Sequence, residues 1–200
     1  FYGYTLDVNK NVLIPRRETE ELVEYVIKYA KRLNKPAIID VGTGTGAIAI
    51  ALSKELNLPV YASDISTKAI EVARKNVEKT GSKVSLLLGD MLKPYIDKNI
   101  KVDILVSNPP YIREDEKIEK IVKDNEPEIA LYAPNNGLFY YEEILKDAKK
   151  VLNDKFLIAF EIGEKQAFDV EKLAHKYLKD VKVEIKKDLS DKNRFVFVYN

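Results

Sequence analysis

The stretch DVGTGTG, residues 40–46, decides how this chain folds, because its three alternating glycines lie between two apolar runs. Residues 37–41 (AIIDV) have the pattern of a short buried strand, and residues 47–52 (AIAIAL) begin a helix that is apolar on most of its faces. Glycine adopts backbone angles that other residues avoid, and its missing β-carbon lets a ligand approach main-chain N–H groups. We therefore expect a polar or charged ligand where this helix begins.

Two carboxylates narrow the class of ligand. Asp64 ends the next apolar run, residues 59–63, where an acidic side chain suits the two hydroxyls of a ribose and so indicates a ligand that contains adenosine. The turn reads Gly-x-Gly-x-Gly instead of the Gly-x-Gly-x-x-Gly of dinucleotide-binding proteins, and Asp40 places a negative charge directly before it. This charge repels phosphate but suits a cationic amino-acid head group or a sulfonium. A glycine-rich turn alone is also compatible with a tight connection that binds nothing.

A second motif, NPPY at residues 108–111, follows the strand-like run VDILVS, residues 102–107. Its two prolines hold φ near about −65° and remove two N–H donors, so the carbonyl groups of this segment remain available as acceptors in a rigid loop. The loop is therefore suited to accept hydrogen bonds.

Further motifs occur around these two in a characteristic order. They are FxG at residues 1–3, VLIPRxETE at 12–20 and NEP at 125–127, and together with the glycine turn and NPPY they resemble the PrmC/HemK family of peptide chain release factor glutamine N5-methyltransferases. The resemblance covers essentially the whole chain, and the IPRxETE stretch is more specific than the four-residue box. It implies transfer of a methyl group from S-adenosylmethionine to the side-chain amide nitrogen (N5) of the glutamine in the Gly-Gly-Gln motif of a class 1 release factor, with S-adenosylhomocysteine as the product.

The resemblance also implies which residues hold the cofactor. The glycine turn would hold the methionine moiety, Asp64 the ribose, and Asp90 with Met91 the adenine. Family members often carry a large aromatic side chain near the position of Met91, and a thioether can cover the same apolar face of the base. The full set of implied cofactor-binding residues is Asp40, Gly42, Thr43, Gly44, Thr45, Gly46, Asp64, Asp90, Met91 and Asn108.

For the substrate, the resemblance implies that Asn108 and the Pro109 carbonyl accept the two amide hydrogens of the target glutamine while Tyr111 packs beside its side chain. An amide nitrogen is a poor nucleophile because its lone pair is delocalised into the carbonyl. Two acceptors aimed at its N–H bonds direct the lone pair at the methyl group and stabilise the developing positive charge. The implied catalytic residues are Asn108, Pro109 and Tyr111, and the implied substrate-binding residues are these three with Pro110 and Arg16.

This chemistry needs no strong base and no metal ion, so other ionisable residues are read as structural. His175 is expected on a surface helix, and Glu161, at the end of a strand near the edge of the site, is expected to be architectural. Arg16 either contacts the cofactor side of the pocket or forms a surface ion pair with Glu18 or Glu20. The segment YAPNNGL, residues 132–138, replaces the family's glycine-rich turn but retains Asn and Gly, which favour a turn.

The alternation of strands and helices predicts an α/β fold, a doubly wound and mostly parallel seven-stranded sheet. Residues 181–185 and 194–199 are joined by a connection too short for a helical crossover and should form a C-terminal antiparallel hairpin, as in the class I, Rossmann-like methyltransferases. Residues 1–35 are expected to provide a lead-in strand or loop and a helix at 20–33, and residues 36–200 the methyltransferase domain. We expect the family's helical N-terminal docking domain to be absent, which makes the chain a domain excerpt or a naturally reduced form.

Composition limits the partners. The 33 basic and 32 acidic residues are interspersed, for example along an expected helix at 113–123, which argues against a basic stripe for duplex DNA. Cysteine is absent, which is compatible with a reducing compartment, and no signal sequence or membrane-spanning run is recognisable. We expect a cytoplasmic monomer that acts on a release factor and binds neither nucleic acid nor membrane.

Two other functions share these motifs. An N-methyltransferase that acts on an exocyclic amino group of a nucleic-acid base faces the same lone-pair problem, but it needs a basic, aromatic-lined groove or a recognition domain, which the sequence does not show. A non-catalytic module that binds S-adenosylmethionine would not need both Asp64 and the complete NPPY box.

Overall fold

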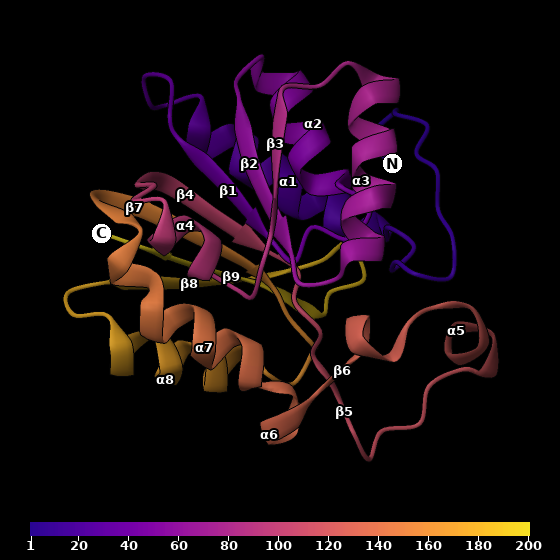
Figure 1. Cartoon of the computed structure of the whole chain (residues 1–200). Coiled ribbons are helices and arrows are strands. Elements are labelled where there is room, and N and C mark those ends of the chain that lie inside the picture. The colour runs from indigo at the N-terminus through magenta and orange to yellow at the C-terminus, as the bar shows by residue number, and fades with distance from the viewer.

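Seven strands form one sheet at the centre of the computed structural model, which describes residues 1–200 (Figure 1). The strand order is β3-β2-β1-β4-β7-β9-β8, and only β9 runs antiparallel to its neighbours, β7 and β8. The predicted parallel sheet with a C-terminal antiparallel hairpin is therefore confirmed. The strands in chain order are β1 (Ile38–Val41), β2 (Val60–Asp64), β3 (Val84–Leu88), β4 (Val102–Ser107), β7 (Leu152–Glu161), β8 (Lys182–Lys187) and β9 (Asn193–Tyr199).

Helices cover both faces of the sheet because its strands are apolar on both sides. In β7, Leu157 and Ala159 belong to one buried cluster, which contains α1 and α2, whereas Ile158 and Phe160 belong to the other, which contains α4, α7 and α8. This alternation places two cores back to back across a single sheet. The helices are α1 (Arg17–Ala30), α2 (Ala47–Leu56), α3 (Thr67–Thr80), α4 (Lys93–Asp97), α7 (Phe139–Asp147) and α8 (Ala167–Tyr177), with a 3-10 turn η2 (Ala148–Lys150).

The first helix begins earlier than the expected span of residues 20–33. It starts at Arg17, soon after Pro15, and ends at Ala30, after which the N–H of Leu33 donates to the Ala30 carbonyl in a turn. The early start places Thr19 in the first helical turn, where its side chain is buried. From this position the Thr19 hydroxyl reaches Glu161 at the end of β7.

The prediction of a helix at residues 113–123 is wrong for most of this segment. Ile112 and Arg113 form a short strand, β5, because the Ile112 N–H donates to the Leu131 carbonyl and β5 pairs with β6 (Tyr132–Ala133). The Arg113 guanidinium then binds Asp115 with two hydrogen bonds of 2.9 and 2.7 Å across a turn. Helix α5 begins only at Lys120, since these local contacts compete with helical hydrogen bonds in the first part of the segment.

A small lobe projects from the carboxyl end of the sheet (Figure 1). It ends in a turn, α6 (Pro134–Gly137), in which Asn135, Asn136 and Gly137 all have left-handed backbone angles, with φ of 54°, 57° and 82°. Asn and Gly tolerate this conformation best, so the predicted turn is confirmed. The other elements of the lobe are β5 (Ile112–Arg113), α5 (Lys120–Asn125), the 3-10 turn η1 (Glu128–Ala130) and β6 (Tyr132–Ala133).

Candidate active site

A cleft of about 940 Å³, counting the space open to solvent, lies at the carboxyl ends of β1, β2 and β4. Strand order reverses between β1 and β4, and open α/β sheets bind ligands at such a point. The cleft brings together the two motifs that the sequence singles out. Of the site residues predicted from the sequence, those that line the cleft are Gly42, Thr43, Gly44, Thr45, Asp64, Met91, Asn108 and Pro110. The predicted residues that do not line it are Asp40, Gly46, Asp90, Pro109, Tyr111 and Arg16.

The glycine turn forms the floor of the cleft. The N–H groups of Gly42 and Thr43 both donate to the Ser63 carbonyl, at 2.9 and 2.8 Å, which anchors the turn to β2. A β-carbon on Gly42 or Gly44 would meet no atom within 4 Å, so the space beside the backbone is free for a ligand. Gly46 has a different role, because its φ is 84° and a β-carbon there would lie 3.2 Å from the Ile50 side chain.

Asp64 connects β2 to the glycine turn. Its Oδ2 accepts a hydrogen bond from the Gly44 N–H and its Oδ1 accepts one from the Ser66 N–H, both at 2.9 Å. Burial raises the pKa of Asp64, and the backbone donors oppose this shift. Each carboxylate oxygen retains a lone pair, so Asp64 can still accept hydrogen bonds from a pair of ligand hydroxyls.

Asp40 lies beneath the turn and is fully buried. Its Oδ2 accepts a 2.5 Å hydrogen bond from the Thr43 hydroxyl, but its Oδ1 has no partner. Burial raises the pKa of Asp40 to about 7, and the nearby Asp64 adds to this rise. A cationic group beside the turn would favour the ionised form of both carboxyl groups, which fits a ligand with an ammonium or sulfonium group.

Apolar side chains wall the adjoining part of the cleft. Ile65, Met91 and Tyr140 line it, and the Ile65 side chain is 51% exposed despite its size. Met91 adopts the unusual φ of 40°. Asp90, which was expected to contact the adenine, is exposed and does not reach the cleft wall. Sequence reasoning missed Ile65 and Tyr140, although Ile65 directly follows Asp64, the residue predicted to bind the ribose, and so was available as a signal.

The NPPY loop faces the glycine turn from the end of β4. The Ser107 hydroxyl donates to the Val41 carbonyl at 2.6 Å and ties this strand end to β1. Asn108 and Pro110 line the cleft, whereas Pro109, between them, is buried. Tyr111 is half-buried and packs against the core cluster that contains Tyr141 and Phe160, and burial raises the pKa of Tyr111 to about 12. The tyrosine therefore stays neutral at physiological pH.

Gln166 and Gly137 support the NPPY loop. The sequence indicated Gly137 as a turn residue but not its contact with this loop, and it did not indicate Gln166. The Gln166 side chain donates to the carbonyls of Tyr111 and Asn136, at 3.0 and 3.2 Å, and accepts from the Gly163 N–H at 2.9 Å. Gly137 lies so close to the Tyr111 carbonyl and the Gln166 amide that a β-carbon at this position would collide with both. The loop is thus clamped from α8 and from the lobe.

Arg16 pairs with Glu126 at 2.5 Å, so the alternative of a surface ion pair with Glu18 or Glu20 is wrong, and a role in substrate binding stays a prediction. Glu126, the acid of the NEP motif, is only 6% exposed and also accepts a 3.2 Å hydrogen bond from the Ile14 N–H. The burial of Glu126 favours a partner of opposite charge within reach, and the loop geometry brings Arg16 to it. The pair joins the IPR and NEP segments, each of which contributes to the cleft wall through Pro15 and Pro127.

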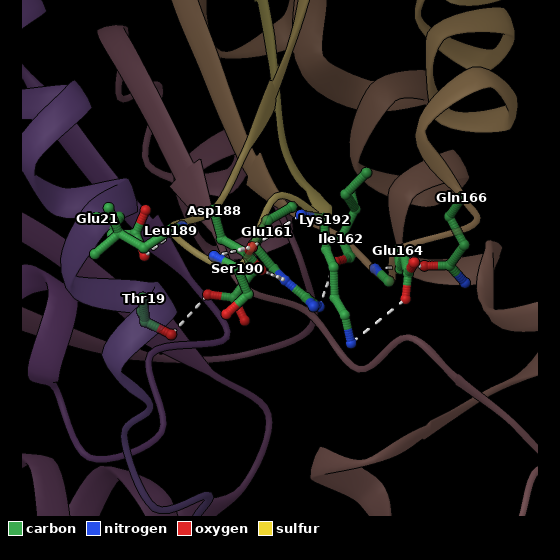
Figure 2. Close-up of polar contacts among 12 residues, drawn as sticks. Thr19, Glu21, Glu161, Ile162, Glu164, Gln166, Asp188, Leu189, Ser190 and Lys192 are labelled. Atoms are coloured by element: carbon green, nitrogen blue, oxygen red, sulfur yellow. Dashed lines mark hydrogen bonds and ion pairs between the residues drawn. The ribbon is translucent and has the colours of Figure 1, made fainter.

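His175 and Glu161, which the sequence analysis treats as structural, differ in burial and in their contacts. His175 is exposed on α8, far in sequence from the cleft residues, and lines no part of it. Glu161 is only 2% exposed and accepts a 2.6 Å hydrogen bond from the Thr19 hydroxyl (Figure 2). Burial raises the pKa of Glu161 to about 7. In residues 1–200 no helix is long and apolar enough to cross a membrane, and no three acidic, histidine or cysteine side chains form a group that could hold a metal ion.

Comparison with known proteins agrees with this geometry. Residues 19–170 match the methyltransferase small domain family. The chain is 42% identical over 203 residues to the release factor glutamine methyltransferase of Bacillus subtilis, covering 98% of this chain and 70% of that protein. It is 43% identical over 203 residues to the enzyme of the same name from Streptococcus pneumoniae, with 99% and 71% covered.

Solved structures give the same architecture. The release factor-specific protein-(glutamine-N5) methyltransferase of Alicyclobacillus acidocaldarius superposes with a TM-score of 0.61 at 27% identity, and 94% of each chain is covered. The hMettl16 catalytic domain in complex with MAT2A 3′UTR hairpin 1 superposes with a TM-score of 0.74 at 19% identity, covering 100% of this chain and 75% of that one. At this lower identity the second likeness concerns the fold alone.

Proposed function

Since the chain belongs to the release factor glutamine methyltransferase family, we propose that it methylates the N5 amide nitrogen of the glutamine in the Gly-Gly-Gln motif of a class 1 release factor. S-adenosylmethionine is the methyl donor, as in methyltransferases of this family. One observation carries the proposal: Asn108 of the NPPY box lines the same cleft as the glycine turn and Asp64. An acceptor for amide hydrogens therefore faces the cofactor side of the cleft.

The residues of the glycine turn suit the methionine part of the donor. The free space beside Gly42 and Gly44 admits a ligand close to the backbone, and the unpartnered Asp40 Oδ1 favours positive charge nearby. Asp64 would accept hydrogen bonds from both ribose hydroxyls, and Ile65, with Met91, would cover the faces of the adenine. When bound, the donor supplies an electrophilic methyl group attached to a sulfonium.

The NPPY loop would orient the glutamine. The Asn108 side-chain oxygen and the Pro109 carbonyl would accept one amide hydrogen each, which turns the nitrogen lone pair toward the methyl group. These acceptors also stabilise the positive charge that develops on nitrogen during transfer. Tyr111 would pack beside the glutamine side chain, and the Gln166 bond to the Tyr111 carbonyl would keep the loop in place.

Nearby ionisable groups are not needed as a base before the transfer. The nitrogen becomes more acidic as it accepts the methyl group, so its proton can leave to solvent afterwards. This order requires acceptors positioned in advance rather than a strongly basic side chain, and the proline-rich loop is rigid enough to provide them.

Neither alternative function is favoured. Relatives more than 40% identical are named as enzymes that methylate release factors, whereas the likeness to the RNA-bound hMettl16 domain concerns the fold alone. A non-catalytic module would not require Asn108 to line the cleft opposite Asp64. We further propose S-adenosylhomocysteine as the product, a monomer as the active form, the cytoplasm as its location, and no nucleic acid among its substrates.

Mass spectrometry of a purified class 1 release factor, after incubation with the chain and S-adenosylmethionine, tests the proposal. We expect one methyl group on the Gly-Gly-Gln glutamine, and we expect Asn108→Ala to slow its transfer by about 10²–10³-fold, as for loss of one group that stabilises transition-state charge. Asn34→Ala, at an exposed position in the loop after α1, is the matched control and should retain full activity.

A parallel panel of tRNA and DNA separates the candidate substrates. Methylation of nucleic acid alone would overturn the release factor assignment and assign the same acceptors to a base amine. Cofactor binding without transfer to any substrate would support the non-catalytic module.

A further inference from the structure

A chain of three side chains runs from the cleft into the protein interior. The Asn108 Nδ2 donates to the Thr19 Oγ1 at 3.2 Å, and the Thr19 hydroxyl donates to the Glu161 Oε2 at 2.6 Å. The Asn108 Oδ1 accepts no hydrogen bond from any other group of the protein. Figure 2 shows Thr19 and Glu161 pointing toward each other from α1 and from the end of β7.

The two inner members of this chain are buried. Thr19 is 4% exposed and Glu161 is 2% exposed, and no lysine or arginine forms an ion pair with Glu161. Arg194 lies close enough to lower the pKa of Glu161, but its guanidinium binds Asp188 and the Ile162 carbonyl instead. Burying a carboxyl group without an ion pair is unfavourable, and such groups are concentrated at functional sites.

The ionised Glu161 carboxylate fixes the direction in which each hydrogen bond of this series is donated. A carboxylate only accepts hydrogen bonds, so the Thr19 hydroxyl must donate its single proton to Glu161. The Thr19 oxygen then has only lone pairs left for Asn108, which must therefore present its NH₂ group inward. The amide oxygen of Asn108 is the group that remains for the cleft, and it is the one that can accept a substrate N–H.

We propose that Thr19 and Glu161 are positioning residues that hold the Asn108 amide with its oxygen toward the substrate. This inference rests on the proposed function, because it explains how the site selects an N–H donor. Without the carboxylate the Asn108 side chain is free to turn by about 180° about its last bond, since the two ends of an amide have nearly the same shape. An inverted amide would present N–H groups to the substrate N–H groups and would oppose the transfer.

The inference predicts that kcat depends on pH. Protonated Glu161 can itself donate a hydrogen bond to Thr19, which reverses the direction of the hydrogen bonds from Glu161 to Asn108. Burial raises the pKa of Glu161 to about 7. The Thr19 hydrogen bond, the Arg194 charge and the nearby Asn108 amide oppose the rise, and Glu18 adds to it. Tyr111 and Tyr141 also face this group, and the Tyr141 hydroxyl donates to the Glu161 main-chain carbonyl at 2.8 Å. Both tyrosines remain neutral below pH 8, so Glu161 is the group of this cluster that titrates, whereas Asp40, whose pKa is also raised to about 7, lies beneath the glycine turn.

The test is the measurement of kcat and KM with the full chain, a purified release factor and S-adenosylmethionine, between pH 6 and pH 8. For the wild type we expect kcat to be about tenfold lower at pH 6 than at pH 8, as for one protonation near pH 7. Glu161→Gln should lower kcat at pH 8 and remove most of this dependence, and any part that Asp40 causes should remain. Glu164→Gln, at an exposed position three residues away, should retain the wild-type profile.

Thr19 variants supply the second part of the test. Thr19→Val should lower kcat by about tenfold or more while the Kd for the cofactor changes little, and Thr19→Ser should restore most of the loss because it retains the hydroxyl. If Thr19→Val fails to fold, the serine variant and Glu161→Gln decide the matter, because both keep a polar side chain of similar or smaller size. An unaltered pH profile in Glu161→Gln would overturn the positioning role, whereas failure of the wild type to methylate the release factor at any pH would overturn the proposed function itself.

Discussion

On one side of the cleft the hydrogen bonds among the glycine turn and residues 63–66 join residues 2 to 21 apart in sequence, whereas on the other side the bonds that hold the NPPY loop and Asn108 join residues 55 to 142 apart. The cofactor side consists of the glycine turn and residues 63–66, where Thr43 bonds Asp40 three residues away and Ser66 bonds Asp64 two residues away. The substrate side consists of residues 108–111 and the side chains that hold them. There Thr19 and Glu161 are 142 residues apart, and Gln166 and Tyr111 are 55 apart.

The difference suggests that the two sides respond differently to mutation. The cofactor side depends mainly on one strand, one turn and one helix, so it should survive disturbances elsewhere in the molecule. The substrate side depends on α1, β7, α8 and the lobe docking correctly, because each contributes a side chain or a turn to it. Damage to docking should therefore reduce methyl transfer before it reduces cofactor binding.

Gly137→Ala should produce the largest difference between the two sides. The new β-carbon would collide with the Tyr111 carbonyl and the Gln166 amide, at a backbone position whose φ is 82°. We expect methyl transfer to fall by about 100-fold or more, because displaced acceptors no longer align the amide. The Kd for S-adenosylmethionine, measured by calorimetry, should be nearly unchanged.

Gly81→Ala is the matched control, because its φ of 61° imposes a similar backbone strain while a β-carbon there would meet no atom within 4 Å. It should lower thermal stability but leave the kcat of the folded enzyme intact. Equal loss of activity in both variants would show that strain, and not the collision with the loop, explains the Gly137 result.

Asp64→Asn should affect the cofactor side alone. The asparagine has one oxygen for the two N–H groups of Gly44 and Ser66, so one of these donors would face its NH₂ group. We expect the Kd for S-adenosylmethionine to rise about 10–100-fold, in line with the loss of hydrogen bonds to a charged group. The exposed Asp97→Asn on α4 serves as the control, and a parallel loss of release factor binding would argue against independent sides.

Each side contains one buried carboxyl group whose ionisation should destabilise the fold. The pKa of Asp40 and that of Glu161 are both raised to about 7 by burial, from 3.8 and 4.5. Between about pH 4.5 and pH 7 the folded state therefore binds more protons than the unfolded chain, and stability falls as pH rises. We expect a loss on the order of 3–4 kcal/mol per group by about pH 8 in urea unfolding experiments.

Single variants assign this pH dependence to one side or the other. Asp40→Asn and Glu161→Gln should each flatten the profile in part, and the double variant should remove most of it. Asp188 does not interfere, because its pKa is lowered and its contribution is lost only as pH falls through the acidic range. Stability that rises from pH 5 to pH 8 in the wild type would contradict the expected sign.

Gln166→Ala should have the smallest effect. It removes hydrogen bonds to the Tyr111 and Asn136 carbonyls but creates no collision, so the loop loosens without being displaced. We expect kcat to fall by about threefold to tenfold, which corresponds to one or two neutral hydrogen bonds, with cofactor affinity retained. The neighbouring exposed Lys165→Ala provides the baseline, and a loss as large as that of Gly137→Ala would mean that Gln166, and not the turn, positions the loop.

Much of the fold and part of the site were predictable because their signals are local. Glycine spacing, paired prolines and apolar runs report the turn, the loop and the strands within a few residues. The parallel sheet, the terminal hairpin and the family were therefore correct, and the cleft unites the glycine turn with Asn108. The expected helix at 113–123 was wrong because charge alternation along a segment does not reveal strand pairing with β6.

The sequence by itself thus determined the strand-turn-helix unit at residues 38–56, the acceptor loop at 108–111 and membership of the family. Only the tertiary structure decided that Arg16 pairs with Glu126, that Gln166 clamps Tyr111, and that Thr19 connects Glu161 to Asn108. The physical reason is the range of the interactions. Backbone preferences act between neighbouring residues, whereas the partner of a buried polar group depends on which strand ends and helix turns the packed core brings together.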